Sequence, residues 1–138
     1  MIRAVLDANV FISAILVPKG NPAKIIGAWK ADKFQLILSE AILEEISRVL
    51  QYPKIAKRHH WSREEIQMFI DDLAHLAILT PGKIRLRVIP EDPADDSYVE
   101  CAVEGKAEYI VSGDKHLLDL GRYGSVTIVT PRAFLEIL

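Results

Sequence analysis

Residues 4–9 have the sequence Ala4-Val5-Leu6-Asp7-Ala8-Asn9, and the rest of the chain is organised around this stretch. The run from Ile2 to Leu6 is short and rich in aliphatic residues, which is typical of a strand buried on both faces of a parallel sheet. The run ends abruptly at an acid, Asp7. Because ligands of open α/β sheets bind just beyond the carboxyl ends of the strands, Asp7 is a candidate functional residue.

Strands and helices alternate along the rest of the chain. Further strands are expected over residues 34–38, 84–89, 108–112 and 126–129. Segment 84–89 alternates apolar residues with Lys and Arg, which predicts a strand near an edge of the sheet. Good capping residues mark the expected helix starts, at Ser39, Ser62, Asp92 and Asp114. The alternation indicates an α/β fold with a parallel sheet that helices cover on both faces.

The composition is that of a globular protein. A length of 138 residues predicts a single domain over 1–138. The formal net charge of −2 excludes a global basic field that would attract nucleic acid, so any anionic partner needs a local patch or a metal. The single cysteine, Cys101, excludes an intrachain disulfide. With no signal-peptide pattern and no long apolar run, we expect a cytoplasmic protein without a membrane span.

Carboxylates stand at the predicted strand ends and helix starts. Asp7 and Asp114 follow strands, whereas Asp95 and Asp96 lie in the first turn of a helix. Glu45 lies at the edge of the apolar stripe of its helix, about 100° from the centre of that stripe. From there it can face the same edge of the sheet as the other acids. Helix geometry does not choose between Asp95 and Asp96.

Carboxylates gathered at one edge of a sheet repel one another. At an effective dielectric near 20, two unit charges about 4 Å apart cost about 4 kcal/mol. A hard divalent cation relieves this repulsion, and Mg²⁺ and Mn²⁺ prefer carboxylate and water ligands. The joint pattern therefore indicates an acidic metal site. When each acid is considered by itself, Asp92 and Asp114 can also be explained as helix caps, and Glu45 as an exposed surface residue.

Five segments carry a series of motifs that spans essentially the whole chain. They are residues 5–13, 39–50, 92–96, 109–115 and 128–135. In this order the segments resemble the motifs of PIN-domain proteins. In particular, they are similar to the bacterial and archaeal single-domain toxins of toxin–antitoxin pairs.

The resemblance implies a three-layer α/β/α sandwich on a central parallel sheet. It also implies a Mg²⁺- or Mn²⁺-dependent ribonuclease that hydrolyses phosphodiester bonds in RNA. The spacing of the motifs selects Asp96 over Asp95, and the family's acids fall on Asp7, Glu45, Asp96 and Asp114. The expected metal ligands are Asp7, Asp96 and Asp114. Polar residues expected to support them are Asn9, Ser39, Asp95 and Ser112.

One dense basic run, within residues 54–63, is a candidate RNA-binding surface. Its cations are Lys54, Lys57, Arg58 and Arg63, and Trp61 stands among them as a candidate for stacking on a base. The alternative is a solvated connection between two helices. The helix expected over 64–79 has a broad apolar stripe, which we expect in the core. One edge of that stripe could serve a homodimer or an antitoxin segment.

The leading functional hypothesis is therefore a metal-dependent ribonuclease, the toxin of a toxin–antitoxin pair. The alternative is a non-cleaving PIN-like module that binds RNA or protein. A third hypothesis is a small α/β domain that binds a phosphorylated ligand, but the chain has no G-x-x-x-x-G-K-[ST] loop.

Overall fold

Six strands form the sheet at the centre of the computed structural model, which describes residues 1–138. They are β1 (Arg3–Leu6), β2 (Gln35–Leu38), β3 (Ile78–Leu79), β4 (Tyr109–Val111), β5 (Arg122–Tyr123) and β6 (Val126–Val129). The order across the sheet is β3-β2-β1-β4-β6-β5. Every neighbouring pair is parallel except β5 and β6, which are antiparallel. This order places β1 in the interior of the sheet.

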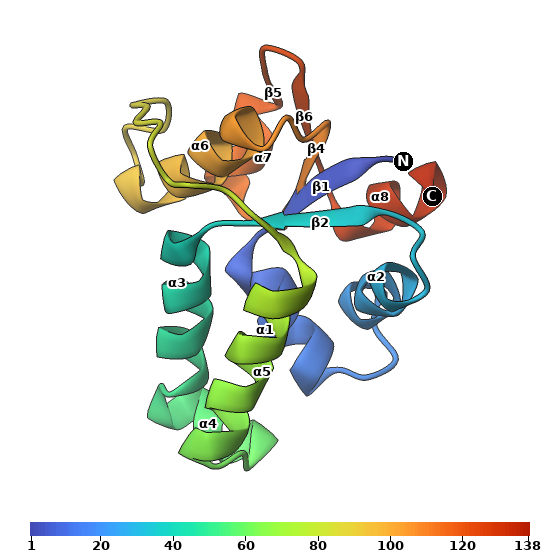
Figure 1. Cartoon of the computed structure of the whole chain (residues 1–138), viewed down its shortest axis with the longest axis vertical. Helices are drawn as coiled ribbons and strands as arrows, with labels where there is room; N and C mark the ends of the chain where they lie inside the picture. Colours follow the sequence, from blue (N-terminus) through green and yellow to red (C-terminus); the bar gives the residue numbers. More distant parts are fainter.

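Helices cover both faces of the sheet. They are α1 (Ala8–Leu16), α2 (Asn21–Lys30), α3 (Glu40–Leu50), α4 (Pro53–His59), α5 (Arg63–Leu76), α6 (Asp96–Glu104), α7 (Lys115–Leu120) and α8 (Pro131–Ile137). A short 3₁₀ helix, η1 (Pro93–Asp95), precedes α6. Figure 1 shows α6 and α7 above the sheet and α1, α2, α3 and α5 below it. The predicted α/β/α sandwich is confirmed, apart from the antiparallel edge strand.

The register of β1 carries Asp7 to the carboxyl edge of the sheet. Leu6 pairs with Val111 of β4, and the backbone N–H of Asp7 donates to the carbonyl of Val111 at 3.0 Å. The last three residues of β1 are buried because helices pack on both faces. One step beyond the pair of Leu6 and Val111, Asp7 and Ser112 therefore leave their strands side by side.

Side-chain caps fix where several helices begin. Ser39 accepts from the amide three residues later, and Ser62 forms a capping box with Glu65. Asp114 accepts from the amides two and three residues later. These contacts confirm the helix starts predicted at Ser39, Ser62 and Asp114. The side chain of Asp92 makes no cap hydrogen bond, so its carboxylate is available to other partners.

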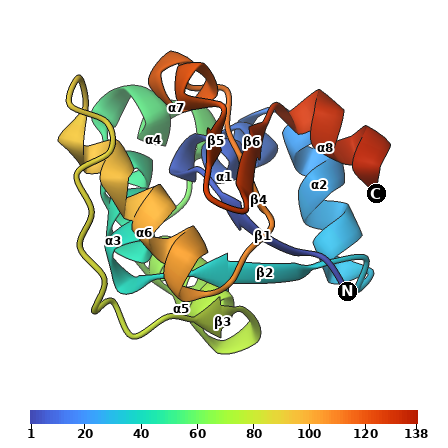
Figure 2. The same cartoon turned by 90° about the horizontal axis from the view of Figure 1, so that it is seen from above.

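Residues 80–92, here called the strap, cross the outer side of α6 (Figure 2). Only the amide of Thr80 bonds to the sheet, at the carbonyl of Leu38, and the strap then leaves it. The strand predicted over 84–89 is therefore wrong, and β3 occupies that edge of the sheet instead. Strap amides donate to carboxylates of α6 at 2.8–3.0 Å, from Gly82 and Lys83 to Glu104, from Leu86 to Glu100, and from Val88 and Ile89 to Asp96. Because side chains satisfy these amides, the strap is extended without a partner strand.

Two further elements were not predicted from the sequence. Residues expected only as a connection form α4, and Arg122–Tyr123 forms the antiparallel strand β5. The core between the layers contains 30 buried hydrophobic residues in one cluster, so all these elements pack around a common interior. None of the helices combines the length and apolar character needed to cross a membrane.

Candidate active site

Asp7 is a buried carboxylate held by two donors at the end of β1. Its Oδ1 accepts a 3.0 Å hydrogen bond from the backbone N–H of Asn9, and its Oδ2 accepts a 2.6 Å bond from Ser112 Oγ. Burial raises the pKa of Asp7 above its usual value, and these hydrogen bonds oppose the rise. The negative charge of Asp114 adds to it. Asp7 is thus fixed in orientation at a poorly hydrated position.

Ser112 links Asp7 to Asp114. Its hydroxyl is fully buried at the end of β4, where it donates to Asp7 and accepts a 2.9 Å bond from the backbone N–H of Asp114. Asp114 uses only Oδ1 to cap α7, through the amides of His116 and Leu117. The other carboxylate oxygen of Asp114 therefore remains available for a ligand.

Asp95 completes a group of three carboxylates with Asp92 and Asp114. One oxygen of each lies within 4.8 Å of the others. The side chain of Asp95 is buried, and its Oδ2 has no hydrogen-bond partner. Burial and the nearby carboxylates of Asp114, Asp92 and Asp7 raise the pKa of Asp95 to about 8. A buried carboxyl with an unpartnered oxygen, in a group of three carboxylates, fits a hard divalent cation, which takes oxygen ligands.

Asp96, an expected metal ligand, is not a member of this group of three carboxylates. Its Oδ1 accepts the backbone N–H groups of Val88 at 3.0 Å and Ile89 at 2.8 Å. Successive residues of a helix differ by about 100° in direction, so the side chains of Asp95 and Asp96 point different ways. Asp95 therefore lies with Asp92 and Asp114, whereas Oδ1 of Asp96 holds the strap.

Glu45 is connected to the acids through Tyr98, a residue that the sequence did not single out. The hydroxyl of Tyr98 donates to Glu45 Oε2 at 2.6 Å and accepts a 3.2 Å bond from the backbone N–H of Ala8. Tyr98 is almost fully buried, and its pKa is raised well above the usual value, by burial first and then by the charge of Asp7. The phenol therefore stays protonated and serves Glu45 as a donor.

The family is decided by the match of a sequence model for the PIN domain to residues 3–116, which contain all the acids described above. The chain belongs to the PIN domain family. It is 29% identical to an uncharacterized protein of Methanocaldococcus jannaschii, over 98% of this chain and 90% of that protein.

A solved structure has the same fold as this PIN domain. It is a chain of VapBC2 from Rickettsia felis, in a crystal structure bound to a DNA fragment from their promoter. The match has a TM-score of 0.61 and covers 94% of this chain and 98% of that chain, at 13% sequence identity. At that identity the likeness concerns the fold alone.

Two of the expected supporting residues of the PIN domain occupy other positions. Ser39 caps α3 and lines a separate cleft with Thr80 and Glu104. Asn9 has an exposed side chain, so its support of Asp7 comes from its backbone N–H. Ser112 alone among the expected polar residues places a hydroxyl between two acids.

The basic residues of segment 54–63 lie on the surface. Lys54, Lys57 and Arg58 are exposed on α4, and Arg63 is exposed at the start of α5. Trp61 lies among them but is half-buried, with its ring 5.5 Å from the rings of His59 and Phe69. Its contacts are those of a packing residue, which does not favour the expected stacking on a base.

Sequence reasoning missed the roles of Tyr98 and Asp92. Tyr98 stands three residues after Asp95, and side chains at this spacing share a face of a helix. That spacing is the signal that could have placed the phenol near the acids. The sequence pattern assigns Asp92 to a helix cap, and the missing cap bond becomes visible only in three dimensions.

Proposed function

We propose that this PIN domain is a metal-dependent ribonuclease, which uses Mg²⁺ or Mn²⁺ to hydrolyse phosphodiester bonds in RNA. The observation that carries the proposal is the buried, unpartnered Oδ2 of Asp95 within a group of three carboxylates. Structural acids are normally satisfied by hydrogen bonds, so an orphaned oxygen among like charges is a functional-site signal.

Asp95 and Asp114 would hold the cation, with Asp92 and Asp7 beside them. This assignment keeps Asp7 and Asp114 from the sequence-based set and replaces Asp96 by Asp95. A bound divalent cation would supply polarisation of the phosphate and activation of a water molecule. Ser112 orients the carboxylate of Asp7 by donating to its Oδ2.

Glu45 would complete the catalytic set from the α3 side. Its carboxylate is fixed by Tyr98 and lines the cleft between α3, the strap and the start of α6. Either Glu45 or Asp114 would orient the attacking water as a general base. Glu45 lies on α3 and Asp114 caps α7, so each can be substituted separately and their contributions to catalysis can be measured one at a time.

The first test is cleavage of labelled single-stranded RNA in Mg²⁺, Mn²⁺ and EDTA, with wild type beside Asp95→Asn and Asp114→Asn. We expect metal-dependent cleavage by the wild type and its loss in both variants. Binding of RNA without cleavage under any metal would favour the non-cleaving module instead. Cleavage in EDTA, or cleavage undiminished in both variants, would contradict the proposed site.

We further propose that the protein is the toxin of a toxin–antitoxin pair and acts in the cytoplasm as a homodimer. The resemblance of its motifs to single-domain toxins supports this role, as does the shared fold with a chain of VapBC2. The test is expression of the chain with and without the product of an adjacent small gene. Growth arrest that the second product relieves, through a co-purifying complex, is the expected result. Growth unaffected by the chain would contradict it.

A further inference from the structure

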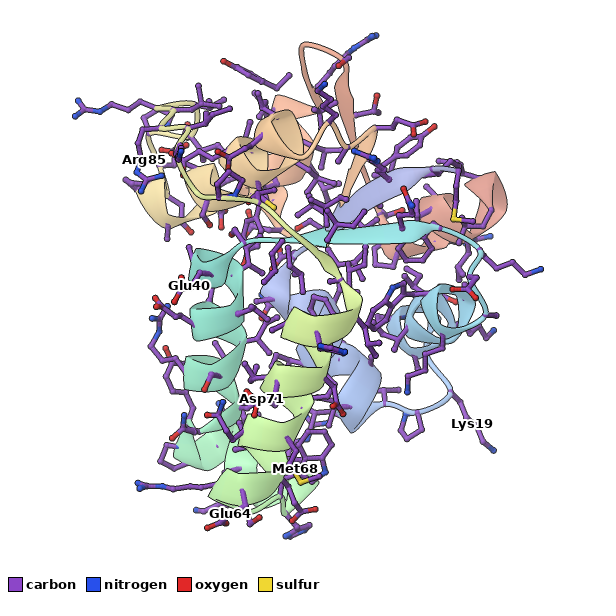
Figure 3. All side chains as sticks on the ribbon, in the orientation of Figure 1. Lys19, Glu40, Glu64, Met68, Asp71 and Arg85 are labelled. Atoms are coloured by element: carbon purple, nitrogen blue, oxygen red, sulfur yellow. The ribbon has the colours of Figure 1, made fainter.

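The strap presents a row of cations on its outer side. Lys83, Arg85 and Arg87 are exposed and alternate with the half-buried Ile84 and Leu86. Alternate residues of an extended chain lie about 7 Å apart on the same side, since each residue adds about 3.3 Å. Figure 3 shows Arg85 at the outer edge of the molecule. This spacing is similar to that of successive phosphates along an extended nucleic-acid strand.

The backbone of the strap is held in place from its inner side. Five of its amides donate to Asp96, Glu100 and Glu104, which follow one another at intervals of four along α6. These carboxylates therefore bind the backbone of the strap and not its cations. The lone ion pair of the chain joins Arg132 and Glu136 on α8. No carboxylate thus lies within salt-bridge distance of Lys83, Arg85 or Arg87.

A cleft extends from Arg85 and Arg87 of this row to Glu45 of the proposed active site. It has a volume of about 950 Å³ and lies between the strap, α3 and the start of α6. Arg48, Arg85 and Arg87 line it, and so does Glu45. Three further acids of the lining are Glu44, Asp96 and Glu100. Asp96 and Glu100 accept from amides of the strap. Guanidinium groups that make no ion pair therefore flank the route by which a phosphate would reach Glu45. That of Arg85 donates to the carbonyls of Gly82 and Ile84.

We propose that the strap and Arg48 bind the phosphate backbone of single-stranded RNA beside the acidic group. The proposal rests on the proposed ribonuclease function and names the surface that holds its substrate. The protein has a net charge of −2 and an acidic centre, so local cations must offset the repulsion of the phosphates. Guanidinium groups suit this task because they bind phosphate through paired N–H donors. Alternate carboxylates of an extended acidic peptide would have the same spacing, so an acidic polypeptide is the competitor in the test.

The test is binding of a fluorescently labelled single-stranded RNA in EDTA, where cleavage cannot interfere, at KCl between about 50 and 200 mM. The variant is Arg85→Gln with Arg87→Gln. The matched control is Arg132→Gln, which removes an exposed arginine from α8. Polyglutamate is included as an acidic competitor, and thermal unfolding checks that each variant is folded.

We expect the double variant to weaken RNA binding on the order of tenfold at low salt. The slope of log affinity against log salt should fall by about 1.4, because each single-strand phosphate contact contributes about 0.7. The control should bind as the wild type does. Unchanged affinity and slope in the double variant would overturn the proposal. It would also be overturned if the wild type bound polyglutamate through the strap and did not bind RNA.

A parallel cleavage assay in Mn²⁺ separates this proposal from the proposed function. If the wild type cleaves RNA and the double variant binds it unchanged, the strap does not bind RNA and the proposed ribonuclease activity still holds. If RNA binding depends on the strap but no cleavage occurs, the RNA-binding role of the strap is supported and the ribonuclease activity is refuted.

Discussion

Tyr98 on α6 donates a 2.6 Å hydrogen bond to Glu45 on α3 and accepts one from the amide of Ala8, the residue that follows Asp7. One phenol thereby fixes the distance between the carboxylate of Glu45 and the start of α1. The bond crosses 53 residues of sequence, and it ties elements from opposite faces of the sheet. Glu45 has no other side-chain hydrogen bond, so its orientation depends on Tyr98.

The first prediction is that Tyr98→Phe reduces kcat for RNA cleavage about tenfold, equivalent to roughly 1.4 kcal/mol, with little change in KM. The ring is retained, so packing is preserved while Glu45 loses its donor. The informative measurement is a double-mutant cycle with Glu45→Gln. The effect of Tyr98→Phe should disappear in that background. An equal loss of rate in both backgrounds would show that Tyr98 acts on stability and not through Glu45.

The second prediction separates Asp95 from its neighbour. Asp95→Asn should abolish Mn²⁺ binding, measured by calorimetry, because it removes the carboxylate charge of Asp95 from the group with Asp92 and Asp114. Asp96→Ala should retain Mn²⁺ binding but destabilise the fold by about 1–3 kcal/mol, because two strap amides lose their acceptor. Loss of Mn²⁺ binding in a folded Asp96→Asn variant would restore Asp96 to the metal site.

The third prediction concerns pH. The pKa of Asp95 is raised to about 8 in the metal-free protein, whereas its ordinary value is 3.8. At a pH between these two pKa values, Asp95 holds a proton in the folded chain and has released it in the unfolded chain. Stability is therefore greatest at the acidic end of this window and falls as pH rises towards 8. The fall is less than about 1.4 kcal/mol per unit, since solvent screens part of the interaction. Urea unfolding in EDTA at pH 5 and pH 8 measures the change. A slope that persists in Asp95→Asn would assign it to another group.

The fourth prediction compares two glycines. A Cβ on Gly105, just after α6, would collide with Ile37 Cγ2 in the fully buried part of β2. Gly105→Ala should therefore destabilise the protein by about 1–3 kcal/mol. Gly27, inside α2, has no atom within 4 Å of the position that an added Cβ would occupy, so Gly27→Ala should stabilise the protein by about 0.5–1 kcal/mol. Chemical denaturation of the two variants measures the change in the free energy of unfolding for each. Equal changes in the two variants would contradict the packing argument.

Much of the fold was predictable because its determinants are local. Apolar runs identified β1, β2, β4 and β6, and capping residues marked the starts of α3, α5 and α7. The strap was not predictable in this way. Its apolar and basic residues alternate as they would in a strand, but its amides donate to side chains that lie 7 to 22 residues later in the chain.

The candidate site was predictable only in part, for a related reason. Asp7 and Asp114 were identified because each follows a buried strand, and parallel strands end at one edge. Asp95 and Asp96 are adjacent in sequence, and the turn of η1 before α6 decides which of them meets Asp114. Tyr98 resembles any other apolar position of an amphipathic helix until its hydroxyl is seen beside Glu45.

The two outermost strands of the sheet, β3 and β5, contain only two residues each. An edge this short exposes too few unpaired amides to act as a template on which another chain could add a strand. The sheet therefore resists growth into fibrils, although its interior strands are strongly apolar and β-branched. Substitutions that lengthen β3 along its exposed, hydrophobic side would remove this protection and promote aggregation.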